Sequence, residues 1–131
     1  MRPKERIKKA QILLELESEA IFEAAKKLDL NFSKCVDLII DCKGTIVISG
    51  LGKSGSIGKK ITSTLVSLGT PSIFLHTSDA FHGDLGILRK NDLLLLISNS
   101  GETEELVKLL NYAHSIGIKS IVISGNENST L

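Results

Sequence analysis

Four short runs, apolar at nearly every position, constrain the fold of this chain most. They are residues 45–48, 72–75, 93–97 and 120–123. Continuous apolar runs of this kind, rich in β-branched residues, favour strands that are covered on both faces, as in a parallel sheet. Helical patterns separate the strands, at about residues 54–68 and 102–116. The repeated order of strand, helix and strand predicts a doubly wound α/β fold with ligand loops at the carboxyl ends of its strands.

Two further helices are expected before the first strand. Lys4–Leu28 carries apolar residues at helical spacing with Lys and Glu on the opposite face, which is typical of an amphipathic helix. At roughly 37 Å it is longer than a small domain needs, so part of its apolar stripe is expected to pack on a partner subunit. A second helix runs from Asn31 or Ser33, the two candidate N-caps, to Asp41. Between Leu75 and Leu93 we expect a loop with one helical turn.

Composition narrows the class of function. The 131 residues are 42% hydrophobic and 24% charged, with a net charge of +1, which is typical of one soluble globular domain. No apolar run approaches a membrane span, and no secretion leader is recognised. Four Phe and one Tyr without a basic stripe argue against nucleic acid as the partner. Cys35 and Cys42 stand too far apart along a helix to pair, so free thiols in a reducing cytoplasm are expected.

A first glycine-rich loop follows the first predicted strand. The segment from Gly50 to Gly58 reads GLGKSGSIG and fits the G-x-G-x-x-G fingerprint of dinucleotide-binding proteins. That fingerprint also needs an acidic residue at the end of the next strand, where this sequence has His76 and Thr77. A Walker A loop needs a glycine where Val47 stands. Dinucleotide binding is therefore a weak alternative.

A second loop, Ser98-Asn99-Ser100-Gly101-Glu102-Thr103, follows the third predicted strand and opens a helix. Three hydroxyls, a flexible glycine and the free N–H groups of a helix N-terminus predict an anion cradle suited to a phosphate monoester. Alternatively, Ser100 or Thr103 caps the helix, and Glu102 or Glu105 closes a capping box. The complete hexapeptide between a strand and a helix favours phosphate binding.

Three histidines remain to be assigned. His82 stands in the glycine-flanked segment HGDLG, where an imidazole can titrate near neutral pH, although such a segment is also typical of a surface turn. His114 falls near the end of a helix, where a cation suits the helix dipole, and no chemistry is assigned to it. His76 follows the second strand and either reaches the site or supports residues that do.

Together these segments resemble the sugar isomerase (SIS) domain, and within it the arabinose-5-phosphate isomerases of Gram-negative bacteria. The resemblance rests on GLGKSG at 50–55, TPS at 70–72, HGDLG at 82–86 and SNSGET at 98–103. The last of these is shared by the whole superfamily, whereas GKSG together with HGDLG is more specific to the isomerase branch. The resemblance covers the chain from about residue 5 to its end.

The resemblance implies a three-layer αβα sandwich with a parallel, flavodoxin-like sheet, and a homotetramer with sites at subunit interfaces. It implies interconversion of D-arabinose 5-phosphate and D-ribulose 5-phosphate through an enediol, without a redox cofactor or metal, in the cytoplasmic route to 3-deoxy-D-manno-octulosonate of lipopolysaccharide or capsule. Residues 1–131 are then expected to be the N-terminal part of an SIS domain, truncated after the fourth strand. The last strand and helices, a further glutamate and histidine of the site, and any CBS domains would be missing.

Roles are carried over from the family residue by residue. Lys53 is expected to neutralise the enediolate oxygen, Glu105 to be the general base, and His82 to assist ring opening or relay a proton. The expected phosphate-binding residues are Ser54, Ser98, Asn99, Ser100 and Thr103. The residues expected to order the loops are Gly52, Gly55, Gly101 and Glu102.

Two other functions stay open on sequence grounds. SIS domains also act as sugar-phosphate-sensing modules that keep the phosphate loop without catalysis, although such regulators normally carry a basic helix-turn-helix segment that the first helix here lacks. An isomerase of another ketose phosphate is the second, because the sequence does not show the shape of the pocket.

Overall fold

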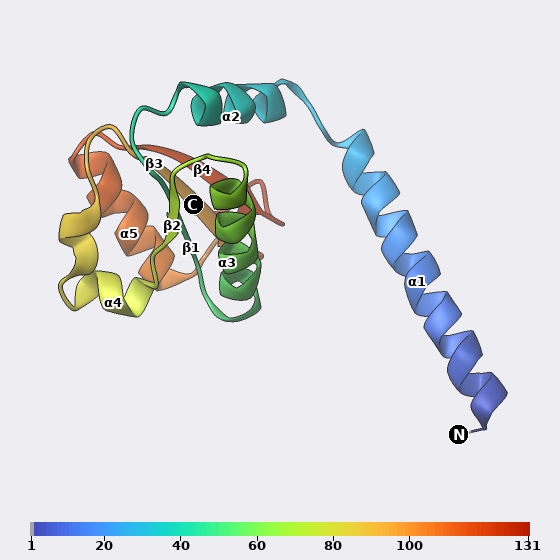
Figure 1. Cartoon of the computed structure of the whole chain (residues 1–131). Coiled ribbons are helices and arrows are strands. Elements are labelled where there is room, and N and C mark those ends of the chain that lie inside the picture. The colour runs from blue at the N-terminus through green and yellow to red at the C-terminus, as the bar shows by residue number, and fades with distance from the viewer. Residues whose placement is uncertain (1) are drawn as a thin grey trace. The chain divides into compact units, whose positions relative to one another are not determined.

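The computed structural model describes residues 2–131, which form two compact units, residues 2–36 and 37–131 (Figure 1). The first unit contains the long helix α1, Pro3–Lys26. Arg2 and Glu5 begin this helix with a capping box, in which the Arg2 backbone N–H donates to Glu5 Oε2 at 2.9 Å. None of the residues of α1 is buried. Across residues 2–131, no helix combines the length and hydropathy that crossing a membrane requires.

Helix α2, Leu30–Asp41, continues from the first unit into the second. The prediction that Asn31 or Ser33 caps this helix is wrong. Asp29 supplies the acceptor instead, since its Oδ1 accepts from the Asn31 backbone N–H at 2.8 Å, and an Asp side chain before the first turn is a favoured cap. Cys42 lies just beyond the helix, and both Cys35 and Cys42 are free thiols, as predicted.

The second unit is built on a parallel sheet in the order β2-β1-β3-β4, as in flavodoxin-like folds. Its strands are β1 (Ile46–Gly50), β2 (Ser72–Phe74), β3 (Leu93–Ser98) and β4 (Lys119–Ser124). Every residue of the two central strands is buried. The predicted parallel sheet is confirmed, and each predicted strand agrees with the observed one to within two residues.

Helices cover the two faces of this sheet and complete three layers. Helix α3, Gly52–Ser67, packs on β1 and β2, where a Cβ on its Gly58 would come within 3.2 Å of Ile48. Val47, the neighbour of Ile48, points to the opposite face because successive strand residues alternate. There it joins the core formed with helix α5, Glu104–Ser115. The predicted αβα sandwich is confirmed.

The segment between β2 and β3 is more ordered than the predicted loop with one turn. It forms α4, Thr77–Phe81, followed by a 3₁₀ helix, Asp84–Ile87. His76 caps α4, since its Nδ1 accepts from the Ser78 backbone N–H at 3.3 Å. The cap was missed because histidine is an uncommon residue at this position.

Burial in the central strands predicts where the fold is most sensitive. Leu96 is fully buried between β1 and β4, so Leu96→Ala is expected to lower the free energy of unfolding by about 2–5 kcal/mol. Ile57 on α3 is 57% exposed, and Ile57→Ala should change it by less than about 0.5 kcal/mol. Urea unfolding followed by circular dichroism measures both. Equal effects of the two substitutions would contradict the assigned core.

Candidate anion-binding site at the carboxyl ends of the strands

The crevice between the ends of β1 and β3 is the natural ligand position in this sheet. Here the chain order reverses, because β1 leads through α3 to one edge while β3 leads through α5 to the other, and ligands bind at such switch points. Gly50 pairs with Ile97 at this end. A Cβ on Gly50 would lie 3.0 Å from the Ser54 carbonyl carbon and 3.1 Å from the Ile97 carbonyl oxygen. The glycine therefore lets both glycine- and serine-rich loops start side by side.

The second of these loops, residues 98–103, is shaped by its own hydroxyls. Ser98 is buried, and its Oγ lies 2.9 Å from Thr103 Oγ1 and accepts from the Gly101 backbone N–H at 3.1 Å. Ser100 is exposed, and its Oγ accepts from the Glu102 backbone N–H at 3.2 Å. Ser98 and Thr103 thus face each other across the base of the loop, and Ser100 stands at its rim.

The alternative prediction, that Ser100 or Thr103 caps helix α5 through its side chain, is wrong. Thr103 occupies the N-cap position of α5, but its side chain makes no capping hydrogen bond, because its hydroxyl lies against Ser98. The capping box with Glu102 or Glu105 is therefore absent at this described helix end. The N–H groups of the first turn of α5 remain available to a ligand.

A segment that the sequence analysis did not single out packs against the same loop. The Leu131 backbone N–H donates to the Gly101 carbonyl oxygen at 3.1 Å, and the Gly125 N–H donates to the Asn99 carbonyl oxygen at 3.0 Å. Ser124, Ser129 and Thr130 lie in this segment. The sequence did offer a signal for this segment. Its polar run SGNENST directly follows an apolar strand, just as polar, glycine-containing loops follow the first and third strands.

The first loop, residues 50–55, contains the lysine Lys53 at the start of α3. Gly52 opens α3 in the left-handed region, with φ of +55°, and a Cβ on Gly55 would lie 2.6 Å from the Gly50 carbonyl oxygen. Lys53 is exposed in the first turn of α3 and Ser54 is half-buried. Neither makes a side-chain hydrogen bond or ion pair among residues 2–131. The first turn of α3 also contains no acidic residue, so its positive dipole end is not neutralised from within.

Three carboxylates lie in the second loop or directly after it, and each has a different environment. Glu102 binds Thr130, accepting from its hydroxyl at 2.5 Å and its backbone N–H at 2.8 Å, and these bonds hold the pKa of Glu102 below its ordinary value. Glu104 pairs with Lys108 at 2.6 Å, which likewise lowers its pKa. Glu105 is exposed and has no side-chain partner among the described residues. Its carboxylate is therefore not committed to another described side chain.

The rings of the two remaining histidine candidates make no hydrogen bond to either loop among residues 2–131. His82 is exposed at the end of α4, and no hydrogen bond among residues 2–131 links its ring to either loop. His76 contacts Phe74 edge to face at 6.5 Å between ring centroids. Thr77 is fully buried, and its hydroxyl has no partner among the described residues. Within the described chain, no three His, Cys, Asp or Glu side chains gather as metal ligands.

A hollow of about 480 Å³ lies at the opposite, amino end of the sheet. Its lining consists of Lys43, Gly44, Thr45, Ile73, Ile87, Arg89, Asn91 and Asp92. Asp92 is buried there with both oxygens occupied, since they accept from the Thr45 and Arg89 backbone N–H groups at 2.8 Å each. Different groups lie in the loops at the carboxyl ends of the strands: the N-termini of α3 and α5, Lys53 and several hydroxyls. Free N–H groups at a helix N-terminus favour an anion.

The fold is a doubly wound α/β domain whose two glycine- and serine-rich loops start at neighbouring strand ends, at a topological switch point. Residues 38–131 match the SIS domain family. Since this match covers well over half of the chain, the protein belongs to the SIS domain family.

Relatives share much of this sequence. The chain is 48% identical over 116 residues to the arabinose 5-phosphate isomerase KpsF of Escherichia coli O6:H1, covering 88% of this chain and 36% of that protein. It is 43% identical over 125 residues to the arabinose 5-phosphate isomerase KdsD of Pseudomonas aeruginosa, covering 95% and 38%. The chain therefore spans little more than a third of the length of these curated relatives.

One solved structure combines high similarity with a bound ligand. The E. coli CFT073 protein c3406, in complex with arabinose 5-phosphate, superposes with a TM-score of 0.92 at 35% identity, covering 98% of this chain and 69% of that one.

The close packing of Ser129 on Gly101 can be tested by substitution. Gly101 has φ of +69°, and a Cβ there would overlap the Ser129 side chain. Gly69 has φ of +85° with open space around it, so Gly69→Ala measures backbone strain alone, at about 1 kcal/mol. Gly101→Ala is expected to cost clearly more in thermal unfolding, and Ser129→Gly in the same chain should recover the excess. Equal losses for the two alanine variants would contradict the observed packing.

The bonds from Thr130 to Glu102 predict an acid-sensitive contact. Because the pKa of Glu102 is lowered on folding, the stabilisation is present above its unfolded pKa near 4.5 and is lost as pH falls through the folded value. Chemical unfolding between about pH 3 and 6 should show a shallower loss of stability for Glu102→Gln than for the parent chain. An unchanged pH profile would show that the contact contributes nothing in solution.

Proposed function

We propose that the crevice binds the phosphate of a pentose 5-phosphate and that the protein to which this chain belongs interconverts D-arabinose 5-phosphate and D-ribulose 5-phosphate. The observation that supports the proposal is the pairing of β1 with β3, because the loop that contains Lys53 and Ser54 and the Ser98–Thr103 loop start at the ends of these neighbouring strands. Support comes from relatives named arabinose 5-phosphate isomerase and from the similar structure in complex with arabinose 5-phosphate.

Phosphate binding is the first step of the proposed chemistry. The first-turn N–H groups of α3 and α5, together with the hydroxyls of Ser54, Ser100 and Thr103 and the amide of Asn99, would hold the anion. Ser98 contributes through the shape of the loop, because its hydroxyl is buried and occupied. Anchoring one end of the sugar would hold C1 and C2 in one place relative to the reacting groups, which is the main gain from orientation.

Proton transfer is the second step. In this proposal Glu105 removes the proton from C2 of the aldose, and Lys53 donates a hydrogen bond to the oxygen that becomes negative in the enediolate. A proton then moves from O2 to O1, and the same carboxylic acid returns its proton to C1 as the C2 carbonyl forms, which yields the ketose. His82 is assigned to ring opening or proton relay, and its ring is exposed.

Assembly and location complete the proposal. Catalysis is assigned to a homo-oligomer, a tetramer, because α1 leaves its apolar residues uncovered. A cytoplasmic location, with a role in lipopolysaccharide or capsule formation, is proposed from the named relatives and the two free thiols.

Binding tests the phosphate step. Ser100→Ala is expected to weaken the affinity for arabinose 5-phosphate roughly 10- to 100-fold, the value of a hydrogen bond to a charged group. Ser115→Ala, at the far end of α5, is the matched control and should leave it unchanged. Isothermal titration calorimetry measures both, and unaltered affinity in Ser100→Ala would remove this residue from the site.

Turnover tests the proton step. Formation of ribulose 5-phosphate from arabinose 5-phosphate should fall roughly 10²- to 10⁴-fold in Glu105→Gln, the range lost with a positioned general base. Glu104→Gln, which removes the neighbouring carboxylate, should retain most activity. If both variants turn over normally, the base is elsewhere; tight binding by the parent chain without turnover would instead favour a sugar-phosphate-sensing module.

A further inference from the structure

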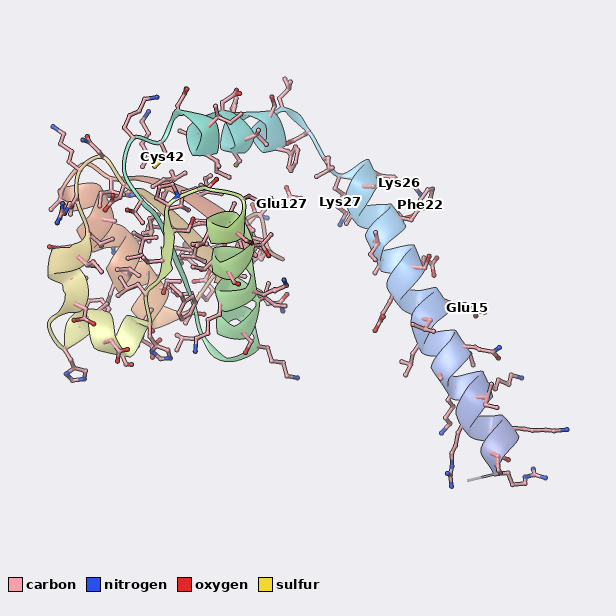
Figure 2. All side chains as sticks on the ribbon, viewed as in Figure 1. Glu15, Phe22, Lys26, Lys27, Cys42 and Glu127 are labelled. Atoms are coloured by element: carbon pink, nitrogen blue, oxygen red, sulfur yellow. The ribbon has the colours of Figure 1, made fainter. Side chains whose placement is uncertain are left out.

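Helix α4 is a single short turn, Thr77–Phe81, with a histidine at each end. His76 is its N-cap residue and His82 is its C-cap residue. Figure 2 shows the side chains on α4, the yellow helix, and on the elements around it. A helix this short is unstable by itself, because fixing the first turn costs more conformational entropy than one hydrogen bond offsets. The position of α4 therefore depends on the groups that hold its two ends.

The ring of His76 holds the first end. Its Nδ1 lies 3.3 Å from the Ser78 backbone nitrogen and 2.7 Å from the Ser78 hydroxyl oxygen. The backbone N–H can only donate, so Nδ1 accepts and carries no proton in this arrangement. The neutral ring then has its proton on Nε2. An imidazolium could not cap α4 in this way, because both of its nitrogens are donors.

Two neighbouring elements fix the position of His76 itself. Ser49 is fully buried on β1, and its hydroxyl donates to the Leu75 carbonyl oxygen at 2.7 Å, which holds the chain where it leaves β2. The His76 ring meets the Phe74 ring edge to face, with 6.5 Å between the centroids. Phe74 packs against α3, since a Cβ on Gly58 would lie 2.9 Å from its ring. The imidazole is therefore oriented by β1 and α3, the two elements that flank the first loop.

Hydrogen bonds carry this order through α4 to His82. The Ala80 backbone N–H donates to the His76 carbonyl oxygen at 3.0 Å, and the His82 N–H donates to the Asp79 carbonyl oxygen at 3.0 Å. Ala80 is buried in the core that also contains residues of α5. The backbone of His82 is thus the end of one hydrogen-bonded turn that begins at His76.

We propose that His76 is a positioning residue: its neutral imidazole caps α4 and thereby fixes the backbone of His82. The inference rests on the proposed isomerase function, in which His82 assists ring opening or relays a proton. This role needs an acceptor at the N-cap and no chemistry of the imidazole itself. Asparagine supplies such an acceptor, is a favoured N-cap residue and does not titrate. Capping and direct contact with the ligand therefore predict different results for His76→Asn.

Amide hydrogen exchange of the isotopically labelled chain tests the capping step. His76→Ala removes the acceptor, so exchange of the Ala80 and His82 amides is expected to become roughly 2- to 30-fold faster, the equilibrium range of one lost N-cap. His76→Asn should return both rates close to those of the parent chain. His114→Ala, which removes a histidine from the last turn of α5, is the matched control and should leave them unchanged. Unchanged rates in His76→Ala, or equally fast exchange in His76→Asn, would overturn the proposal.

The ring tautomer tests the same step without a substitution. A long-range ¹H–¹⁵N correlation spectrum of the parent chain at about pH 8, where imidazole is neutral, should show His76 with a bare Nδ1 and a proton on Nε2. A proton on Nδ1 would contradict the capping role, because the ring could then not accept from the Ser78 N–H.

Turnover of arabinose 5-phosphate connects the cap with His82. The kcat of His76→Ala is expected to be at least about twofold lower than that of the parent chain, and His76→Asn should recover it. Parent-like turnover in His76→Ala would overturn the proposal, and so would an asparagine variant as slow as the alanine variant, which indicates an imidazole that contacts the ligand. If the parent chain shows no turnover, the proposed isomerase function fails, and the exchange rates and the tautomer alone decide whether His76 fixes His82.

Discussion

The parallel pairing of β1 with β3 is the constraint on which the rest of the second unit depends. Five registered residue pairs, from Ile46–Leu93 to Gly50–Ile97, hold two strands that are buried along their whole length. Because parallel strands end at the same edge, this pairing also decides which loops meet. The core and the candidate site are two consequences of one register.

Around that pairing, the loops are stabilised by their own polar groups more than by apolar contacts. Ser98 binds the backbone of its own loop, and Glu102 binds Thr130. The side chains of Lys53, Ser54 and Glu105, by contrast, make no hydrogen bond or ion pair among residues 2–131. The internal hydrogen bonds of Ser98 and Glu102 hold the loop in one shape.

Much of this arrangement could be predicted from the sequence, since unbroken apolar runs specify buried parallel strands and glycines mark where loops begin. The αβα layers and the neighbourhood of the two loops followed from that pattern. What could not be predicted are contacts between distant segments. The packing of Ser129 against Gly101 needs the register of β4, and capping of α4 by His76 needs the direction in which the chain leaves β2. The internal use of Ser98 depends on a loop geometry that its type alone does not fix.

Phosphate binding in the crevice is tested most directly by an amide chemical-shift titration of the isotopically labelled chain with arabinose 5-phosphate and, separately, with arabinose. The phosphorylated sugar is expected to perturb the backbone amides of residues 52–55 and 99–105, and the free sugar is expected to leave them unchanged. Perturbations confined to Lys43, Gly44 and Asn91 at the amino ends of the strands, or identical effects of both sugars, would contradict this assignment.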